Sequence, residues 1–186
     1  MKALLILLMA ALGSCAPAAP EGTSQGSLAV TTSREPDVRY EPSPKPVVRD
    51  MPELAEVGPE DVVYDLGSGD GRIPIMAAEV FGARGVGIDI DPRRIAEAQA
   101  NALEAEVADR VTFRNEDLFE ADFSDATVVT LFLSRDVNRR LRPILRSHLK
   151  PGTRVVSYWH DMGDWEPERT VSTERANIYL WTIPPR

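Results

Sequence analysis

The stretch DLGSGDGR, residues 65–72, places three glycines and two aspartates in eight positions. It follows the apolar run Val62-Val63-Tyr64 and precedes the apolar segment Ile73-Pro74-Ile75. Glycine lacks a Cβ atom, so a loop of this composition lets a ligand lie directly against the peptide backbone. The free amides in the first turn of a following helix would point into the same space. We therefore expect residues 65–72 to form a ligand-binding loop between a strand and a helix.

The spacing of these glycines narrows the class of ligand. Loops that bind a dinucleotide carry the pattern Gly-x-Gly-x-x-Gly, whereas Gly67, Gly69 and Gly71 follow Gly-x-Gly-x-Gly. Asp70 stands inside the loop, and its charge would repel a pyrophosphate. A ligand that carries positive charge suits this loop better, so a nicotinamide-dependent dehydrogenase is disfavoured.

The chain around the loop alternates between apolar strands and helices. Strands are expected at residues 61–66, 84–90, 110–114, 126–133 and 154–160, and helices at 51–57, 71–81, 91–106 and 135–149. Residues 169–172 and 177–183 have the pattern of a two-stranded hairpin. Strands that alternate with helices predict right-handed βαβ units and a mostly parallel sheet. Such α/β sheets bind ligands at the carboxyl ends of their strands.

Acidic residues also stand where the second and third strands are expected to end. Asp89 lies 22 positions after Gly67, and a carboxylate there can accept hydrogen bonds from both ribose hydroxyls. Asp117, in the segment NEDLF, can accept a hydrogen bond from an adenine amino group. A glycine-lined wall, a ribose acid and an adenine acid together describe a site for an adenosine whose tail is not a phosphate.

Three motifs, VVYDLGSGDGR, GVGIDID and RNEDLF, resemble in order and spacing the first three motifs of class I S-adenosylmethionine-dependent methyltransferases. The resemblance spans about residues 40–184. YEPSP before the core, with LRPILRSHLKPGTRVVSYWHDMGDWEP and IYLWTIP after it, is similar to a bacterial branch akin to particular protein-lysine methyltransferases. Those enzymes modify the mitochondrial ATP synthase c-subunit and the adenine nucleotide translocase.

The resemblance implies a Rossmann-like class I methyltransferase fold, with helices on both faces of the sheet and a C-terminal antiparallel hairpin. It also implies S-adenosyl-L-methionine as the cofactor, and an amine, first of all a protein lysine, as the methyl acceptor. A small-molecule methyltransferase and a non-catalytic, membrane-tethered binding module on this scaffold are the alternatives. No metal site is expected.

The same resemblance assigns roles to individual residues. The methionine part of the cofactor would be lined by Asp65, Gly67, Ser68, Gly69 and Gly71, with Asp65 near the ammonium group. Asp89 would hold the ribose, Ile90 would lie against the adenine face, and Asp117 and Leu118 would meet the adenine. Tyr40 would cover the cofactor from the N-terminal side.

The acceptor side is less well defined by the sequence. Many nitrogen methyltransferases carry Asn/Asp-Pro-Pro-Tyr/Phe after the fourth strand, but residues 130–134 read TLFLS, so methylation of a nucleobase or a glutamine amide is not expected. Aromatic and acidic side chains suit a cationic amine, and the fifth strand is followed by Tyr158, Trp159, His160, Asp161, Asp164 and Trp165. The catalytic group is unknown, with His160, Asp161 and Trp165 as candidates. Packing roles for Trp159 and Trp165, and a hydrogen-bonding role for His160, are the alternatives.

Composition limits the size of the fold and the kind of partner. A chain of 186 residues is long enough for one domain with a proper core. Its net charge of −8 argues against a nucleic-acid partner. Residues 135–149 carry several arginines opposite an apolar stripe that includes Leu141 and Leu145, which indicates a solvated face. We expect a monomer whose partner is a protein or small-molecule amine.

The N-terminal segment predicts export. Lys2 precedes a short apolar run and then LGSC, residues 12–15, which resembles the lipobox of bacterial lipoproteins. We therefore expect a signal peptide at 1–15, lipidation of Cys15, a disordered tether at 16–38 and the methyltransferase domain at 39–186. The protein would then be anchored at the periplasmic face of the inner or outer membrane, in contact with the membrane only through its lipid. It would be cytoplasmic if the signal is not used.

Overall fold

The glycine loop lies between β1 (Val62–Leu66) and α2 (Arg72–Phe81), as the sequence predicts. The computed structural model describes residues 35–186. The predicted signal peptide with Cys15, and residues 16–34 of the predicted tether, lie outside the described residues. Among the helices of residues 35–186, none has both the length and the apolar character needed to cross a bilayer.

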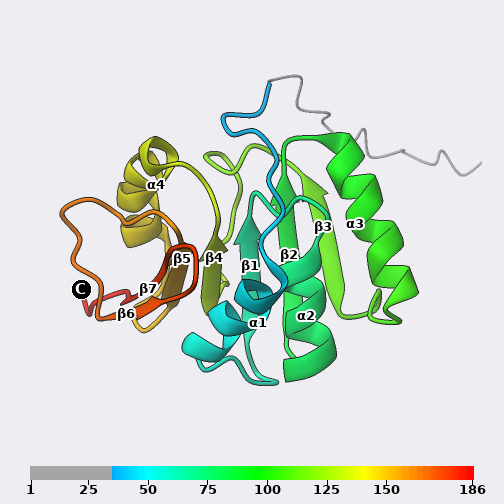
Figure 1. Ribbon diagram of the computed structural model, residues 1–186, viewed down its shortest axis with the longest axis horizontal. Coiled ribbons are helices and arrows are strands. Elements are labelled where there is room, and N and C mark those ends of the chain that lie inside the picture. The colour runs from blue at the N-terminus through cyan, green and yellow to red at the C-terminus, as the bar shows by residue number, and fades with distance from the viewer. Residues whose placement is uncertain (1–34) are drawn as a thin grey trace, which may run out of the picture.

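The described residues form one mixed sheet with helices on both sides (Figure 1). The other elements, in chain order, are α1 (Lys45–Leu54), β2 (Arg84–Asp89), α3 (Pro92–Glu104), β3 (Val111–Asn115), β4 (Val128–Leu131), α4 (Arg135–His148), β5 (Arg154–Tyr158), β6 (Arg169–Ser172) and β7 (Asn177–Thr182). The sheet has seven strands in the order β3-β2-β1-β4-β5-β7-β6. Strands β1 to β5 pair in parallel, while β7 pairs antiparallel with both β5 and β6. This topology confirms the predicted fold class.

Two hydrophobic clusters occupy the two faces of the sheet. On one face, Leu141 of α4 belongs to a cluster that includes Leu66 of β1. On the other face, Val48 of α1 and Ile73 of α2 belong to a cluster that includes Val63 of β1. Because neighbouring residues of β1 point to opposite faces, this single strand is buried on both sides, and all five of its residues are buried.

The position of β1 creates the crevice in which a ligand can bind. It pairs with β2 on one side and with β4 on the other. The helices that follow β1 and β4 cover opposite faces of the sheet. The connections that leave β1 and β4 therefore turn toward opposite faces of the sheet. A crevice forms between them at the carboxyl ends of the two strands, as at the switch point of other doubly wound sheets.

Helix α1 begins earlier than the predicted range 51–57. It runs from Lys45 to Leu54, with Pro44 at its N-cap and Pro46 in its first turn. Proline is well tolerated at the start of a helix, where its missing N–H has no partner to lose. The buried stripe that starts at Val47 then packs the helix onto the sheet.

Residues 35–38, which the sequence assigns to the tether, contact the domain in the described part of the chain. Val38 packs against the core cluster on the α4 face. Asp37 forms an ion pair with Arg140 of α4, at 3.1 Å. Composition alone placed these residues in the tether, because it does not show tertiary contacts such as that of Asp37 with Arg140, 103 positions away. Residues 35–38 therefore contribute to the domain rather than leading up to it.

We predict that Gly71→Ala destabilises the fold by about 2 kcal/mol or more. Gly71 has a φ of +79°, and a Cβ there would lie 2.6 Å from Cζ of Phe113 and 2.8 Å from Cβ of Ala98. Gly152→Ala is the matched control, because Gly152 also has positive φ but nothing lies within 4 Å of the added atom. Urea unfolding should show a clearly larger loss for Gly71→Ala. If both variants lose the same free energy of unfolding, the packing of Phe113 and Ala98 around Gly71 does not require glycine there.

Candidate cofactor site

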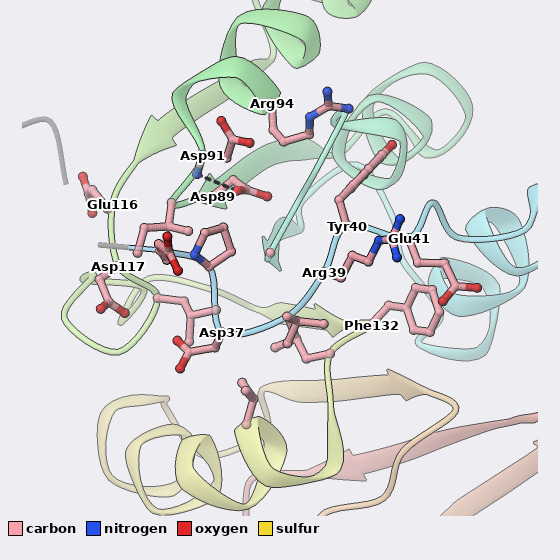
Figure 2. A pocket seen from close by; sticks show the side chains of 18 of the residues that line it. Asp37, Arg39, Tyr40, Glu41, Asp89, Asp91, Arg94, Glu116, Asp117 and Phe132 are labelled. Atoms are coloured by element: carbon pink, nitrogen blue, oxygen red, sulfur yellow. Dashed lines mark hydrogen bonds between the residues drawn. The ribbon is translucent and has the colours of Figure 1, made fainter. Parts of the chain in front are cut away.

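A cavity of about 570 Å³ lies at the carboxyl ends of the central strands. Its volume is within the range of small-molecule sites. Five of the residues predicted to bind the cofactor line it: Gly67, Asp89, Ile90, Asp117 and Leu118. Figure 2 shows Asp89 and Asp117 on one side of the cavity and Tyr40 and Phe132 on the other.

A smaller pocket adjoins this cavity and shares Gly67, Tyr40 and Phe132 with it. Asp65, Ser68 and Gly69 line it. Gly71 lines neither space; it is the N-cap of α2 and turns the chain into that helix. The structure therefore places the predicted residues around two adjacent spaces, except Gly71, which lies at the end of the loop where α2 begins.

Asp89 fastens the glycine loop to the end of β2. One of its carboxylate oxygens accepts a hydrogen bond from the Gly69 amide at 2.8 Å, and the other accepts one from the Asp91 amide at 2.9 Å. Burial raises the pKa of Asp89, although these two backbone bonds oppose the change. Each carboxylate oxygen has more than one lone pair, so the group can still accept hydrogen bonds from a ligand in the cavity.

Asp65 is a buried carboxylate with one short hydrogen bond. The hydroxyl of Thr130 donates to it at 2.7 Å, and only 4% of the residue is exposed. Burial raises the pKa of Asp65 to about 7. A buried acid of this kind is stabilised in its charged form by a cation placed beside it.

Ser68 supplies the second unusual group in the smaller pocket. Its hydroxyl oxygen is buried and has no hydrogen-bond partner among the described residues. Buried polar groups are nearly always paired, and exceptions of this kind need an explanation. Asp65 lines the same pocket as Ser68, and a buried acid there fits a ligand with an ammonium group.

Asp117 shapes the loop that follows β3. Its carboxylate accepts a hydrogen bond from the Phe119 amide at 2.9 Å. Ile90 and Leu118 add apolar surface to the same end of the cavity. Asn115 holds this end in place, because its side-chain amide donates to the carbonyls of Asp89 and Ile90, at 3.0 and 2.9 Å. The sequence analysis did not single out Asn115.

Residues 35–41 form one side of the main cavity. Tyr40 lies directly over the glycine loop, since a Cβ on Gly69 would be 2.4 Å from its ring. The guanidinium of Arg94, on α3, lies 4.5 Å from the centre of the same ring, which is a cation–π distance. Tyr40 was predicted to cover the cofactor, whereas Arg94 was not recognised, because its partner is distant in sequence.

Asp70 is neutralised within the protein. Arg72 donates to its carboxylate through Nε at 2.8 Å and to the Ser43 carbonyl at 2.7 Å. Burial works against the charge of Asp70, but the hydrogen bonds and positive charge of Arg72 outweigh it, so the pKa of Asp70 is lowered. The hydrogen bond from Arg72 to the Ser43 carbonyl ties the start of α2 to the chain before α1.

The three candidate catalytic residues lie outside the two lined spaces. Trp165 packs against Trp181, with ring centres 5.7 Å apart, and its carbonyl accepts the Trp181 indole N–H at 2.7 Å. The carboxylate of Asp161 accepts a hydrogen bond from the Gly163 amide at 3.0 Å and shapes the loop. The pKa of His160 is lowered, first by burial and then by the charge of Arg135.

We predict that Asp65→Asn makes the free protein more stable at pH 8 and leaves its stability nearly unchanged near pH 4. The folded pKa of Asp65, about 7, lies above its ordinary value of 3.8. The folded state therefore binds more protons, and the stability of the native protein is lost as pH rises through this window. Urea unfolding at pH 4.5, 6 and 8 measures the difference. If the free energies of unfolding of Asp65→Asn and the native protein differ by the same amount at all three pH values, the pKa of Asp65 is not raised.

Known proteins match this arrangement over most of the domain. The ANTKMT methyltransferase domain family matches residues 65–169. A protein-lysine N-methyltransferase from Saccharolobus islandicus is 46% identical over 153 residues, which are 80% of this chain and 95% of that protein. The adenine nucleotide translocase lysine N-methyltransferase of Mus musculus is 31% identical over 122 residues, covering 65% of this chain and 53% of that protein.

A solved structure matches equally well. The crystal structure of an RNA methyltransferase from Salinibacter ruber in complex with S-adenosyl-L-homocysteine is 61% identical, with a TM-score of 0.78. The match covers 78% of this chain and 95% of that one. These findings confirm the Rossmann-like methyltransferase fold and S-adenosyl-L-methionine as the cofactor. The chain belongs to the family of ANTKMT methyltransferase domains, which makes it an S-adenosyl-L-methionine-dependent methyltransferase.

Proposed function

We propose that this enzyme transfers the methyl group to the side-chain amine of a protein lysine. The observation that carries the proposal is the match over nearly the whole length of the Saccharolobus protein-lysine N-methyltransferase. The adenine nucleotide translocase lysine N-methyltransferase of mouse matches 65% of the chain as well. The aromatic and acidic side chains after β5 are compatible with an acceptor that arrives as a cation.

In this proposal, each end of the cofactor is recognised by a group already described. Asp65 and Ser68 receive the ammonium group, because one is a buried acid and the other a buried hydroxyl without a partner. Asp89 accepts the ribose hydroxyls at the end of β2. Asp117 receives the adenine amino group, with Ile90 and Leu118 on the apolar faces of the base.

The bound cofactor supplies a methyl group activated by a sulfonium centre. The lone pair of the lysine nitrogen forms a bond to the methyl carbon as the bond from carbon to sulfur breaks, and the sulfur becomes a neutral thioether. A lysine amine has an ordinary pKa near 10.4 and must lose a proton before it reacts. His160 is the candidate to take that proton, since an imidazole can act as a general base. Burial lowers its pKa, and it lies outside the two lined spaces.

RNA is a second candidate acceptor. The Salinibacter structure carries the description of an RNA methyltransferase, and α4 is rich in arginine. The net charge of −8 opposes the binding of a polyanion. An experiment has to separate the two acceptors directly.

We predict that Asp89→Ala weakens cofactor binding at least tenfold, or about 1.4 kcal/mol. The substitution removes the proposed ribose acceptor and also the carboxylate that holds the Gly69 amide. Isothermal titration calorimetry with S-adenosyl-L-methionine measures the change. Asp109→Ala, at an exposed position before β3, controls for the loss of one negative charge. Unchanged affinity in Asp89→Ala would remove this residue from the site.

The acceptor is tested with the methyl-labelled cofactor, a bacterial protein extract and purified RNA in parallel reactions. We expect label in protein, recovered as methylated lysine after hydrolysis and mass spectrometry, and none in RNA. Asp89→Ala serves as the variant with impaired cofactor binding. Label only in RNA would support the second candidate. Tight cofactor binding without transfer to protein, RNA or small amines would instead favour a binding module.

A further inference from the structure

Trp159 occupies a strained turn immediately after β5. Its φ is +74°, and the amide of His160 donates to the carbonyl of Tyr158 at 3.0 Å. A three-residue turn that is closed by such a hydrogen bond, and whose central residue has a positive φ, is a γ-turn of the rare, strained type. Bulky residues avoid this region of backbone conformation. The fold therefore accepts backbone strain at a position where glycine would be relaxed.

The indole of Trp159 is too exposed for its burial to offset the energetic cost of this strain. Trp159 is 44% exposed, which makes it one of the few large apolar side chains of the described domain that remain open to solvent. The other two tryptophans behave differently, because Trp181 is fully buried and Trp165 packs against it. Strained backbone that the surrounding structure holds in place is characteristic of functional positions.

A buried polar cluster fixes the turn. The side-chain amide of Asn138 on α4 donates to the hydroxyl of Ser157 and to the carbonyl of His160, both at 3.0 Å. The Ser157 hydroxyl also donates to the His160 carbonyl, at 2.7 Å. Asn138 and Ser157 are fully buried. On the other side, the Trp159 amide donates to the Asn177 carbonyl of β7, at 2.8 Å.

Aromatic rings connect the cofactor spaces with this turn. Phe132 follows β4 and lines both the main cavity and the smaller pocket. Its ring centre lies 4.9 Å from that of Tyr158, and Tyr158 in turn meets Trp159 edge-on at 5.9 Å. Since β4 and β5 are parallel neighbours, Trp159 lies at the same edge of the sheet as the cavity.

We propose that Trp159 determines acceptor specificity by receiving the methylene stem and the ammonium group of the incoming lysine. This inference rests on the proposed transfer to lysine. An exposed indole can pack along an alkyl chain and attract a cation over its face. Asn138 and Ser157 act as positioning residues, because they hold the turn that carries the indole. The indole lies outside the two lined spaces and connects through Tyr158 to Phe132, which lines both.

Trp159→Gly separates this role from a role in packing. Glycine relieves the strained turn, so the melting temperature should not fall, and the dissociation constant for S-adenosyl-L-methionine should stay the same. The KM for a short lysine-containing peptide should rise about tenfold, in line with loss of one cation–π contact, while kcat changes little. The KM of Trp159→Phe should lie between that of the native protein and that of Trp159→Gly. A lower melting temperature with unchanged KM would overturn the proposal.

Glu106→Gly is the matched control for relief of strain. Glu106 has a φ of +56° and stands exposed after α3, away from β5. This variant should gain stability without any change in KM. A rise in KM equal to that of Trp159→Gly would show that relaxed backbone, rather than the lost indole, weakens the acceptor.

Binding measured without turnover keeps the two proposals distinct. The protein is saturated with S-adenosyl-L-homocysteine and titrated with the lysine peptide, or with the same peptide carrying norleucine, and binding is measured by isothermal titration calorimetry. We expect the lysine peptide to bind more tightly to the native protein, and Trp159→Gly to remove that preference. If the native protein methylates no lysine, the proposed function fails. If Trp159→Gly keeps the preference for lysine, only the role of Trp159 fails.

Discussion

The attachment of the glycine loop to the end of β2 is the constraint on which the rest of the site depends. The amides of Gly67 and Ser68 both donate to the Ile88 carbonyl, at 2.8 and 3.0 Å, and the amide of Gly69 donates to Asp89 at 2.8 Å. Three successive amides therefore bind one strand end. Because backbone groups hold the loop, its inner surface needs no side chains and can stay open to a ligand.

The site combines this rigid backbone with side chains that are costly in the free protein. Asp65 is buried and carries a raised pKa of about 7, Ser68 has a buried hydroxyl without a partner, and Trp159 occupies a strained turn. Each of these features lowers the stability of the unbound fold. A cation beside Asp65 stabilises its charged form, and the exposed face of the Trp159 indole attracts a cation. The shared preference for a cation links the cofactor end of the site to the acceptor end.

The sequence predicts features that depend on local pattern, and it fails where the partners lie far apart in the chain. The strands, the glycine loop and the acids at the strand ends follow from apolar runs and spacing, and the structure gathers them as expected. The helix expected at residues 51–57 begins at Lys45 instead, because sequence alone does not show which positions α1 buries. The contact of Arg94 with Tyr40, and the brace that Asn138 gives to the turn at Trp159, depend on tertiary packing that no short motif encodes.

The arginines of α4 bear on the choice between a protein and an RNA acceptor. The sequence predicts a solvated face, and most of these arginines are exposed. Several of them also have partners within the domain. Arg140 pairs with Asp37, Arg142 pairs with Asp164, and Arg146 lies 5.6 Å from the centre of the Trp165 ring. Binding to phosphates gains affinity chiefly from cations that are free to displace counterions, and these three already serve the fold. In a chain with a net charge of −8, the remaining positive surface is a weak basis for recognising RNA. A cationic lysine, in contrast, is attracted by the overall charge of the protein before it reaches the exposed indole.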